Sequence, residues 1–131
     1  MSSVSNAFYA QSGGVTAVIN ASACGLFSEL KKNKKKISKI YAGKNGIIGA
    51  LNEEIIDISK INKSDLSNLY YTPAGAFGSC RYKLSKDIES SEYIRLIEVF
   101  KSHNINYFFY NGGGDSADTC LKISKLAKKF N

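Results

Sequence analysis

The chain has 131 residues, 44% of them hydrophobic and 22% charged, and a formal net charge of +7. This length suits one domain with a hydrophobic core of its own, and the composition excludes a wholly disordered chain and a chain built around a membrane-spanning run. The positive charge favours anionic partners such as phosphates, although the densest lysine run, KKNKKK at residues 31–36, is more typical of a solvated helix end and loop.

The first predicted unit is a strand, a glycine turn and a helix. Residues 6–11 (NAFYAQ) form a short aromatic run that leads into Ser12, Gly13 and Gly14. In the segment that follows, apolar residues recur at spacings of three and four, which predicts a helix with one buried stripe. That stripe is expected to comprise Val18, Ala21, Cys24 or Gly25, and Phe27 or Ser28.

Two more strands and a helix are predicted in the middle of the chain. Residues 37–42 (ISKIYA) have the pattern of a strand, as do residues 54–58 after a turn. Residues 90–104 give the clearest helical pattern, with Ser90 or Ser91 as its candidate N-cap. Its apolar residues lie at i, i+3, i+4 and i+7: Tyr93, Leu96, Ile97 and Phe100.

The last predicted unit has the same order of elements as the first. An apolar strand, INYFFY at residues 105–110, runs into the glycines of residues 112–114 and then into a helix. The expected face of that helix consists of Ala117, Cys120, Leu121, Ser124 and Ala127. Three consecutive glycines are costly to order and remove every side chain from that wall of the turn, so we expect a ligand to approach the backbone there.

Strands that alternate with helices predict an α/β fold, namely a Rossmann-like, mostly parallel sheet with helices on both faces. Ligands of such sheets bind at the carboxyl ends of the strands. Both glycine turns lie where a strand ends and a helix begins, so we expect them to share one edge of the sheet. Amide groups at two adjacent helix starts would form a site for a polyphosphate.

Each motif taken alone also has a purely structural interpretation. Residues 112–116 (GGGDS) match neither the Walker loop nor the dinucleotide fingerprint, and they fit a tight connection between strand and helix in which Asp115 is a helix cap. The stretch TPAGAFGSCRYKL at residues 72–84 offers Arg81 and Lys83 to phosphate oxygens, yet its small residues also suit a flexible surface loop.

The cysteines indicate a reducing compartment. Cys24, Cys80 and Cys120 are widely spaced and form no C-x-x-C pair. The first residues lack the basic and apolar regions of a secretory signal. Reduced thiols and a cytoplasmic location, away from the membrane, are therefore expected.

Together, four motifs in the same order resemble the amino-terminal part of a phosphofructokinase. They are QSGGVTAVIN, IYAGKNGIIGAL, TPAGAFGSCRYKL and YNGGGDSADT, and the similarity runs along nearly the whole chain. The likeness is strongest to the pyrophosphate-dependent branch, which transfers a phosphoryl group from pyrophosphate, instead of ATP, to fructose 6-phosphate in glycolysis. The resemblance implies that residues 1–131 are a phosphoryl-donor-binding α/β domain and that Mg²⁺ is the cofactor.

The resemblance also implies roles for individual residues. ATP users have Gly-Gly-Asp-Gly-Ser at the last motif, whereas pyrophosphate users carry an aspartate in the place of Asp115, where its charge and bulk disfavour a nucleotide's α-phosphate. Gly114 stands where ATP users have a magnesium-binding aspartate, which leaves Asp115 as the nearest substitute ligand. Gly14 matches a backbone contact to the donor, Arg81 a phosphate-gripping arginine and, more weakly, Lys83 a second cation. The implied donor site comprises Gly13, Gly14, Arg81, Lys83, Gly113, Gly114, Asp115 and Ser116.

Two parts of the family pattern are expected to be missing. The catalytic base, an aspartate, would follow after Asn131, and the second, sugar-binding α/β domain is expected to be absent too. We therefore expect no catalytic residue within the chain and little or no kinase activity from it alone. An amino-terminal fragment or one piece of a split gene is the favoured explanation, ahead of a remnant kept for binding and of an incomplete sequence. Apolar surface left uncovered then predicts a homo-oligomer or a complementing chain.

A nucleic-acid-binding module is the alternative from another class of function. GKNG at residues 43–46 fits the G-x-x-G loop with which KH domains clamp a nucleic-acid backbone, and the net charge agrees. Such a loop joins two helices, however, whereas GKNG follows the strand-like ISKIYA. We therefore expect pyrophosphate, and not nucleic acid, to be the partner.

Overall fold

The computed structural model describes residues 5–14, 18–73, 75–80 and 90–130. Arg81 and Lys83 lie outside these residues. Along the chain the described elements are β1 (Ser5–Gln11), α1 (Ile19–Lys32), β2 (Ile37–Gly43), α2 (Ile47–Leu51), β3 (Ile55–Asp57), α3 (Lys63–Tyr71), α4 (Ser91–Ser102), β4 (Ile105–Asn111) and α5 (Gly114–Phe130).

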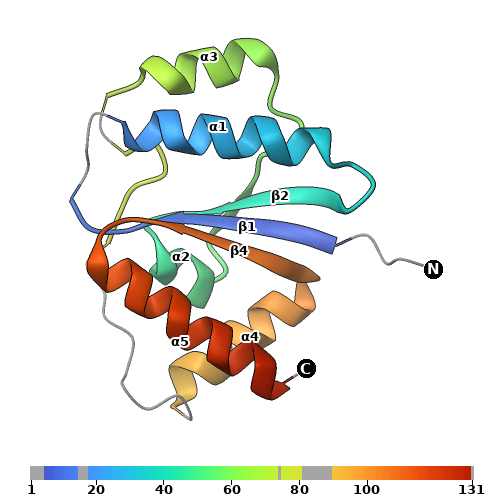
Figure 1. Cartoon of the computed structure of the whole chain (residues 1–131), viewed down its shortest axis with the longest axis vertical. Helices are drawn as coiled ribbons and strands as arrows, with labels where there is room; N and C mark the ends of the chain where they lie inside the picture. Colours follow the sequence, from blue (N-terminus) through green and yellow to red (C-terminus); the bar gives the residue numbers. More distant parts are fainter. Residues whose placement is uncertain (1–4, 15–17, 74, 81–89, 131) are drawn as a thin grey trace.

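The four strands form one sheet in the order β3-β2-β1-β4. The first strand, β1, pairs in parallel with both β2 and β4, and only the short β3 runs antiparallel to its neighbour. Helices α1 and α3 lie over one face of the sheet, while α2, α4 and α5 lie over the other (Figure 1). The prediction of a mostly parallel α/β fold with helices on both faces is therefore confirmed.

The core consists of two layers that are separated by the sheet. Successive side chains of a strand point to opposite faces, so Ala7 and Tyr9 of β1 pack with the α1 layer, whereas Phe8 and Ala10 pack with the α4 and α5 layer. All four are at most 2% exposed. This central position fixes β1 from both sides and makes its carboxyl end a rigid support.

The predicted buried stripes of two helices are wrong in part. Val18 is 63% exposed and lies one residue before α1, which begins at Ile19. Three of the five residues of the expected α5 face are exposed, namely Ala117, Leu121 and Ser124. Both helices carry apolar residues on more than one face, and the packing partner decides which face is buried. For α1 that face comprises Ile19, Asn20, Ala23, Cys24, Phe27 and Leu30, and for α5 it includes Ser116, Thr119, Ile123 and Leu126.

Two helices were not expected from the sequence. Helix α2 has only five residues, and its apolar sequence IIGAL directly follows a turn. Helix α3 begins after Asn62, whose side chain accepts a hydrogen bond from the Asp65 amide at 2.7 Å, and it packs against α1. Among the described helices, none combines the length and the apolar character that crossing a bilayer requires.

Candidate functional site

The two glycine turns lie side by side at one edge of the sheet. β1 and β4 are parallel neighbours, and their last residues, Gln11 and Asn111, stand opposite each other. Just beyond them, the Ser12 amide donates a hydrogen bond to the carbonyl oxygen of Asn111 at 2.9 Å. A Cβ atom on Gly112 would lie only 2.9 Å from the Ser12 carbonyl oxygen. The prediction that both turns share the carboxyl edge is confirmed, and we call this edge, residues 11–14 and 111–116, the rim.

Residues 79–80 of the third motif are hydrogen-bonded to the first glycine turn. Ser12 and Cys80 form a parallel bridge, and the Gly13 amide donates to the Cys80 carbonyl oxygen at 3.0 Å. In return, the Ser79 hydroxyl donates to the carbonyl oxygen of Gly13 at 2.7 Å. Gly13 itself has φ +76°, a left-handed conformation that glycine adopts at no steric cost. Residues 79–80 therefore hold the first turn in shape.

The second motif also reaches the rim. Gly46 has φ +72°, and a Cβ atom there would lie 2.5 Å from the Gln11 carbonyl oxygen and 2.6 Å from the Cys80 sulfur. One residue earlier, the Asn45 amide donates to the Phe77 carbonyl oxygen at 2.9 Å. All four motifs thus meet around the end of β1. The GKNG stretch joins β2 to α2, and this strand-to-helix position differs from the helix-to-helix loop of a KH domain.

Asn20 anchors the third motif to α1. It is 1% exposed, and its side chain donates to the carbonyl oxygen of Thr72 at 2.7 Å and accepts from the Ala76 amide at 3.0 Å. Buried polar side chains that are satisfied by backbone groups fix the course of a loop. Asn20 was not among the predicted site residues, although a polar residue within a helical apolar stripe was a usable signal.

A second buried polar cluster lies where β1 and β4 end. The Tyr9 hydroxyl oxygen accepts hydrogen bonds from the side-chain amides of Gln11 at 2.9 Å and Asn111 at 3.1 Å. Gln11 is fully buried, and its Oε1 atom has no hydrogen-bond partner among the described residues. Burial raises the pKa of the Tyr9 phenol, and the two amide hydrogen bonds offset part of that shift. This cluster couples the last residues of the two strands.

Tyr110 is a titratable residue near the end of β4, next to the rim. Burial raises the pKa of its phenol to about 12, against a smaller opposing effect of the hydrogen bond with Ser12. Its hydroxyl therefore stays protonated at neutral pH. It forms part of the contact between β4 and the Ser12–Cys80 bridge.

We expect the Tyr110→Phe substitution to reduce the loss of stability at alkaline pH. The folded state holds the Tyr110 proton up to about pH 12, whereas an unfolded chain releases it near pH 10, at about the reference pKa. The stabilisation from the neutral phenol is thus complete below about pH 10 and is lost as the pH rises through about 12. Urea unfolding across this window checks the effect. The control is Tyr71→Phe, on an exposed position of α3; equal slopes for both variants would contradict the assignment.

The structure describes only part of the predicted site. Gly13 and Gly14 follow the end of β1, while Gly113, Gly114, the backbone of Asp115 and Ser116 follow the end of the neighbouring strand β4. Gly14, Gly113 and Gly114 are exposed, whereas Ser116 is 4% exposed. The other part, Arg81 and Lys83, lies outside the described residues. Within the described part of the chain, no three His, Cys, Asp or Glu residues gather as a metal-binding group.

The sequence profile of the family described as "Phosphofructokinase" matches residues 6–131. The chain belongs to the phosphofructokinase family. A Halomonas elongata phosphofructokinase, named pyrophosphate–fructose 6-phosphate 1-phosphotransferase, is 65% identical over 127 residues, and a Methylococcus capsulatus protein of the same name is 60% identical. Each alignment covers 95% of this chain, yet the chain spans about 30% of the length of these relatives.

Solved phosphofructokinase structures share the fold. The pyrophosphate-dependent phosphofructokinase of Nitrosospira multiformis superposes with a TM-score of 0.91 at 61% identity, over 98% of this chain and 31% of its own. That of Marinobacter aquaeolei gives a TM-score of 0.88 at 60% identity, over 97% of this chain and 31% of its own. The family resemblance derived from the four motifs is thereby confirmed.

Proposed function

We propose that the chain forms the phosphoryl-donor site of a pyrophosphate-dependent 6-phosphofructokinase, which converts diphosphate and fructose 6-phosphate to phosphate and fructose 1,6-bisphosphate. One observation carries the proposal: two glycine turns that lie about a hundred residues apart in sequence meet at one rim beside residues 79–80. The names of the relatives support pyrophosphate as the donor.

The proposed site binds pyrophosphate mainly through backbone amides. In α5 the amides of Ser116 and Ala117 already bond to the Gly113 carbonyl oxygen, so the amides of Gly114 and Asp115 remain for the ligand. The Gly13 amide already donates to the Cys80 carbonyl oxygen. Gly13 therefore contributes only the shape of its turn, and Gly14 supplies the next amide for the ligand. The positive end of the α5 dipole adds to the attraction for an anion.

Cations would complete the proposed site. Arg81 directly follows Cys80 in the chain and Lys83 follows two residues later, and we propose them as these cations. Mg²⁺ in phosphate sites commonly takes only one or two carboxylates and completes its shell with phosphate oxygens and water. Asp115 can serve as that single carboxylate, and the metal would neutralise charge on the phosphates.

Asp115 is proposed to select pyrophosphate over ATP. Its backbone lies in the first turn of α5, at the rim where the donor would bind. A carboxylate at this point would meet the additional phosphate of a nucleotide, and like charges brought together at a binding site cost several kcal/mol. Pyrophosphate has no additional phosphate that would meet this carboxylate.

Calorimetry with pyrophosphate and with ATP, both in the presence of Mg²⁺, tests the proposal. We expect binding of pyrophosphate and much weaker binding of ATP. Asp115→Gly is expected to lower the ratio of the two affinities by about tenfold or more, because about 1.4 kcal/mol of relieved repulsion already gives that factor. Asp115→Asn removes the charge but keeps the size of the side chain, so it distinguishes electrostatic repulsion of ATP from steric exclusion.

The matched control is Asp118→Asn, which removes an acidic charge from the next turn of the same helix. Asp118 pairs with Lys122 at 2.7 Å and is solvent-exposed. Its neutralisation should leave the ratio of the affinities unchanged. Absence of pyrophosphate binding in the unmodified chain would overturn the proposed donor site, and equal effects of Asp115→Asn and Asp118→Asn would overturn the role of Asp115.

We also propose a cytoplasmic location. The cysteines, Cys24, Cys80 and Cys120, are all free thiols. This state fits a reducing compartment.

A further inference from the structure

The loop GKNG at residues 43–46 lies at the same edge of the sheet as the two glycine turns. It follows the end of β2, which is the parallel neighbour of β1 on the side away from β4. The turns after β4, β1 and β2 therefore stand in a row along the carboxyl edge (Figure 1). Adjacent strands are about 4.8 Å apart, so this loop extends the row by one such spacing beyond the end of β1.

Close packing fixes the backbone of this loop. A Cβ atom on Gly43 would lie 2.6 Å from the Cζ atom of Phe8. A Cβ atom on Gly49 of α2 would lie 2.5 Å from the Lys44 nitrogen. The Lys44 amide also donates to the Glu54 carbonyl oxygen at 2.9 Å. A backbone that is held by its neighbours in this way presents its side chains from a rigid, preorganised position.

Two residues of the loop, Lys44 and Asn45, are exposed. Asn45 already has a structural role, because its amide donates to the Phe77 carbonyl oxygen at 2.9 Å and a Cβ atom on Gly78 would collide with its Oδ1 atom. Lys44 has no comparable role for its side chain. None of the ion pairs among the described residues involves Lys44. The loop therefore holds an exposed cation beside the rim that no described carboxylate pairs with.

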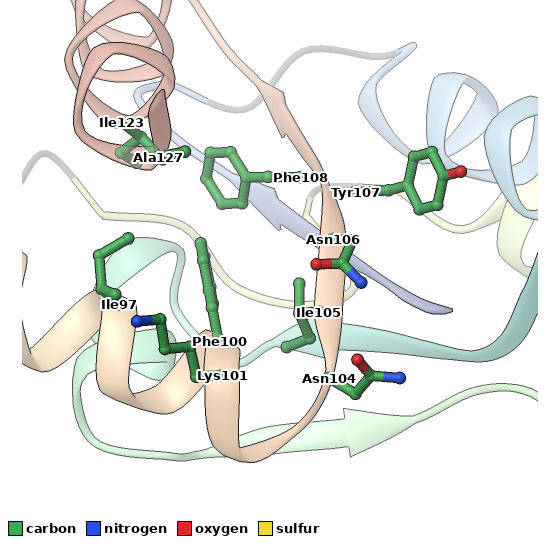
Figure 2. Close-up of a pocket in the computed structure, with 10 residues that line it drawn as sticks. All are labelled: Ile97, Phe100, Lys101, Asn104, Ile105, Asn106, Tyr107, Phe108, Ile123 and Ala127. Atoms are coloured by element: carbon green, nitrogen blue, oxygen red, sulfur yellow. The ribbon is translucent and has the colours of Figure 1, made fainter. Parts of the chain in front are cut away.

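The cavity in Figure 2 lies at the other edge of the sheet. It has a volume of about 250 Å³, it opens between α4, the start of β4 and α5, and its walls include Phe100, Phe108 and Ile123. Among its described lining residues, only Lys101 is charged. Apolar walls do not replace the hydration that a multiply charged anion loses on binding. The carboxyl edge is therefore the better place for pyrophosphate, and Lys101 offers a control for binding at the cavity.

We propose that Lys44 binds the second phosphate group of pyrophosphate and thereby lets the site distinguish a diphosphate from a single phosphate. The first phosphate group would lie at the start of α5, where the amides of Gly114 and Asp115 remain for a ligand, and the second over the turn at Gly14. The loop after β2 is about one strand spacing from the end of β1 and about two, roughly 10 Å, from the end of β4. Lys44 therefore attracts the second phosphate group more strongly than the first. The inference rests on the proposed donor site.

Lys44→Met tests the proposal, because it removes the charge and keeps a long unbranched side chain. By calorimetry with Mg²⁺, we expect pyrophosphate to bind at least about tenfold more weakly to this variant, whereas the affinity for inorganic phosphate changes by less than about threefold. Lys44→Arg keeps the charge and should retain more of the pyrophosphate affinity. The urea midpoint of both variants should stay that of the unmodified chain, since Lys44 is exposed.

Lys39→Met and Lys101→Met are the matched controls. Lys39 is exposed on the same strand and lies roughly 16 Å from Lys44, a separation well beyond the Debye length of about 8 Å at physiological salt. Lys101 borders the cavity in Figure 2. Both controls should bind pyrophosphate as the unmodified chain does. Weakening by Lys39→Met equal to that by Lys44→Met would indicate a general effect of net charge, and weakening by Lys101→Met would indicate binding at the cavity. Either result would overturn the inference.

The outcome for the unmodified chain separates this inference from the proposed donor site. If the unmodified chain binds pyrophosphate and Lys44→Met binds it equally well, the role of Lys44 is wrong and the donor site stands. Equal losses of phosphate and pyrophosphate affinity in Lys44→Met would overturn the discrimination between the two ligands. If the unmodified chain binds no pyrophosphate, the donor site and the role of Lys44 are both wrong.

Discussion

Gly112→Ala is expected to destabilise the chain by about 2–3 kcal/mol, whereas Gly113→Ala, one residue later, should change its stability by less than about 0.5 kcal/mol. A Cβ atom at Gly112 would lie 2.1 Å from the Ser116 hydroxyl oxygen and 2.9 Å from the Ser12 carbonyl oxygen, so the close contact of the two turns would have to open. A Cβ atom at Gly113 meets nothing within 4 Å. Urea unfolding of both variants measures the difference.

The same pair of variants separates folding from binding. Because the space beside Gly113 is open to the rim, a methyl group there would occupy part of the wall that the proposed ligand contacts. We expect Gly113→Ala to retain stability yet to bind pyrophosphate at least about tenfold more weakly by calorimetry, a factor that corresponds to about 1.4 kcal/mol. Unchanged affinity in Gly113→Ala would show that the ligand does not approach this backbone.

Asn20→Ala is expected to cost about 1–2 kcal/mol of the free energy of unfolding. The substitution leaves the Thr72 carbonyl oxygen and the Ala76 amide without the partner that they have in a site where Asn20 is 1% exposed. A buried group that loses its hydrogen bond costs about 1–3 kcal/mol, and Thr72 and Ala76 lie toward the low end because both residues are exposed and water can replace part of the lost bonds. Pyrophosphate affinity should fall as well, because Thr72 and Ala76 belong to the same segment as Cys80, which holds Gly13.

Asn33→Ala provides the control for this prediction. Asn33 lies at the other end of α1, where its exposed side chain donates to the Glu29 carbonyl oxygen at 2.8 Å. Its loss should cost under about 0.5 kcal/mol and leave ligand binding intact. If Asn20→Ala were as mild as Asn33→Ala, Asn20 would not be the anchor of the third motif.

The arrangement of the rim could be predicted because it follows from local patterns and one rule of topology. The runs NAFYAQ and INYFFY each end in glycines and lead into a helix, and parallel strands direct such ends to the same edge. The order of the strands, with β4 beside β1, was not predictable in this way. It depends on pairing between residues at opposite ends of the chain.

The features that the sequence did not reveal depend on tertiary contacts. Asn20 stands in an N-x-S sequence, and only the fold brings it against residues 72–76, more than fifty positions later. The burial of Gln11 likewise depends on Asn111 and Tyr9 at the junction of the two strands. Helix α2 was missed because five apolar residues after a turn fit a strand or a helix equally well.

The central position of β1 has a consequence for the order in which the molecule assembles. β1 leaves the ribosome well before β4, yet its bond from Tyr9 to Asn111 spans 102 residues and its bond from Asn6 to His103 spans 97. Closing loops of this length is slow, because the entropy of the intervening chain is lost before the contact forms. During synthesis β1 therefore pairs early with β2, and it can pair with β4 on its other side only after β4 has been made. The rim therefore becomes complete only when β4 pairs with β1.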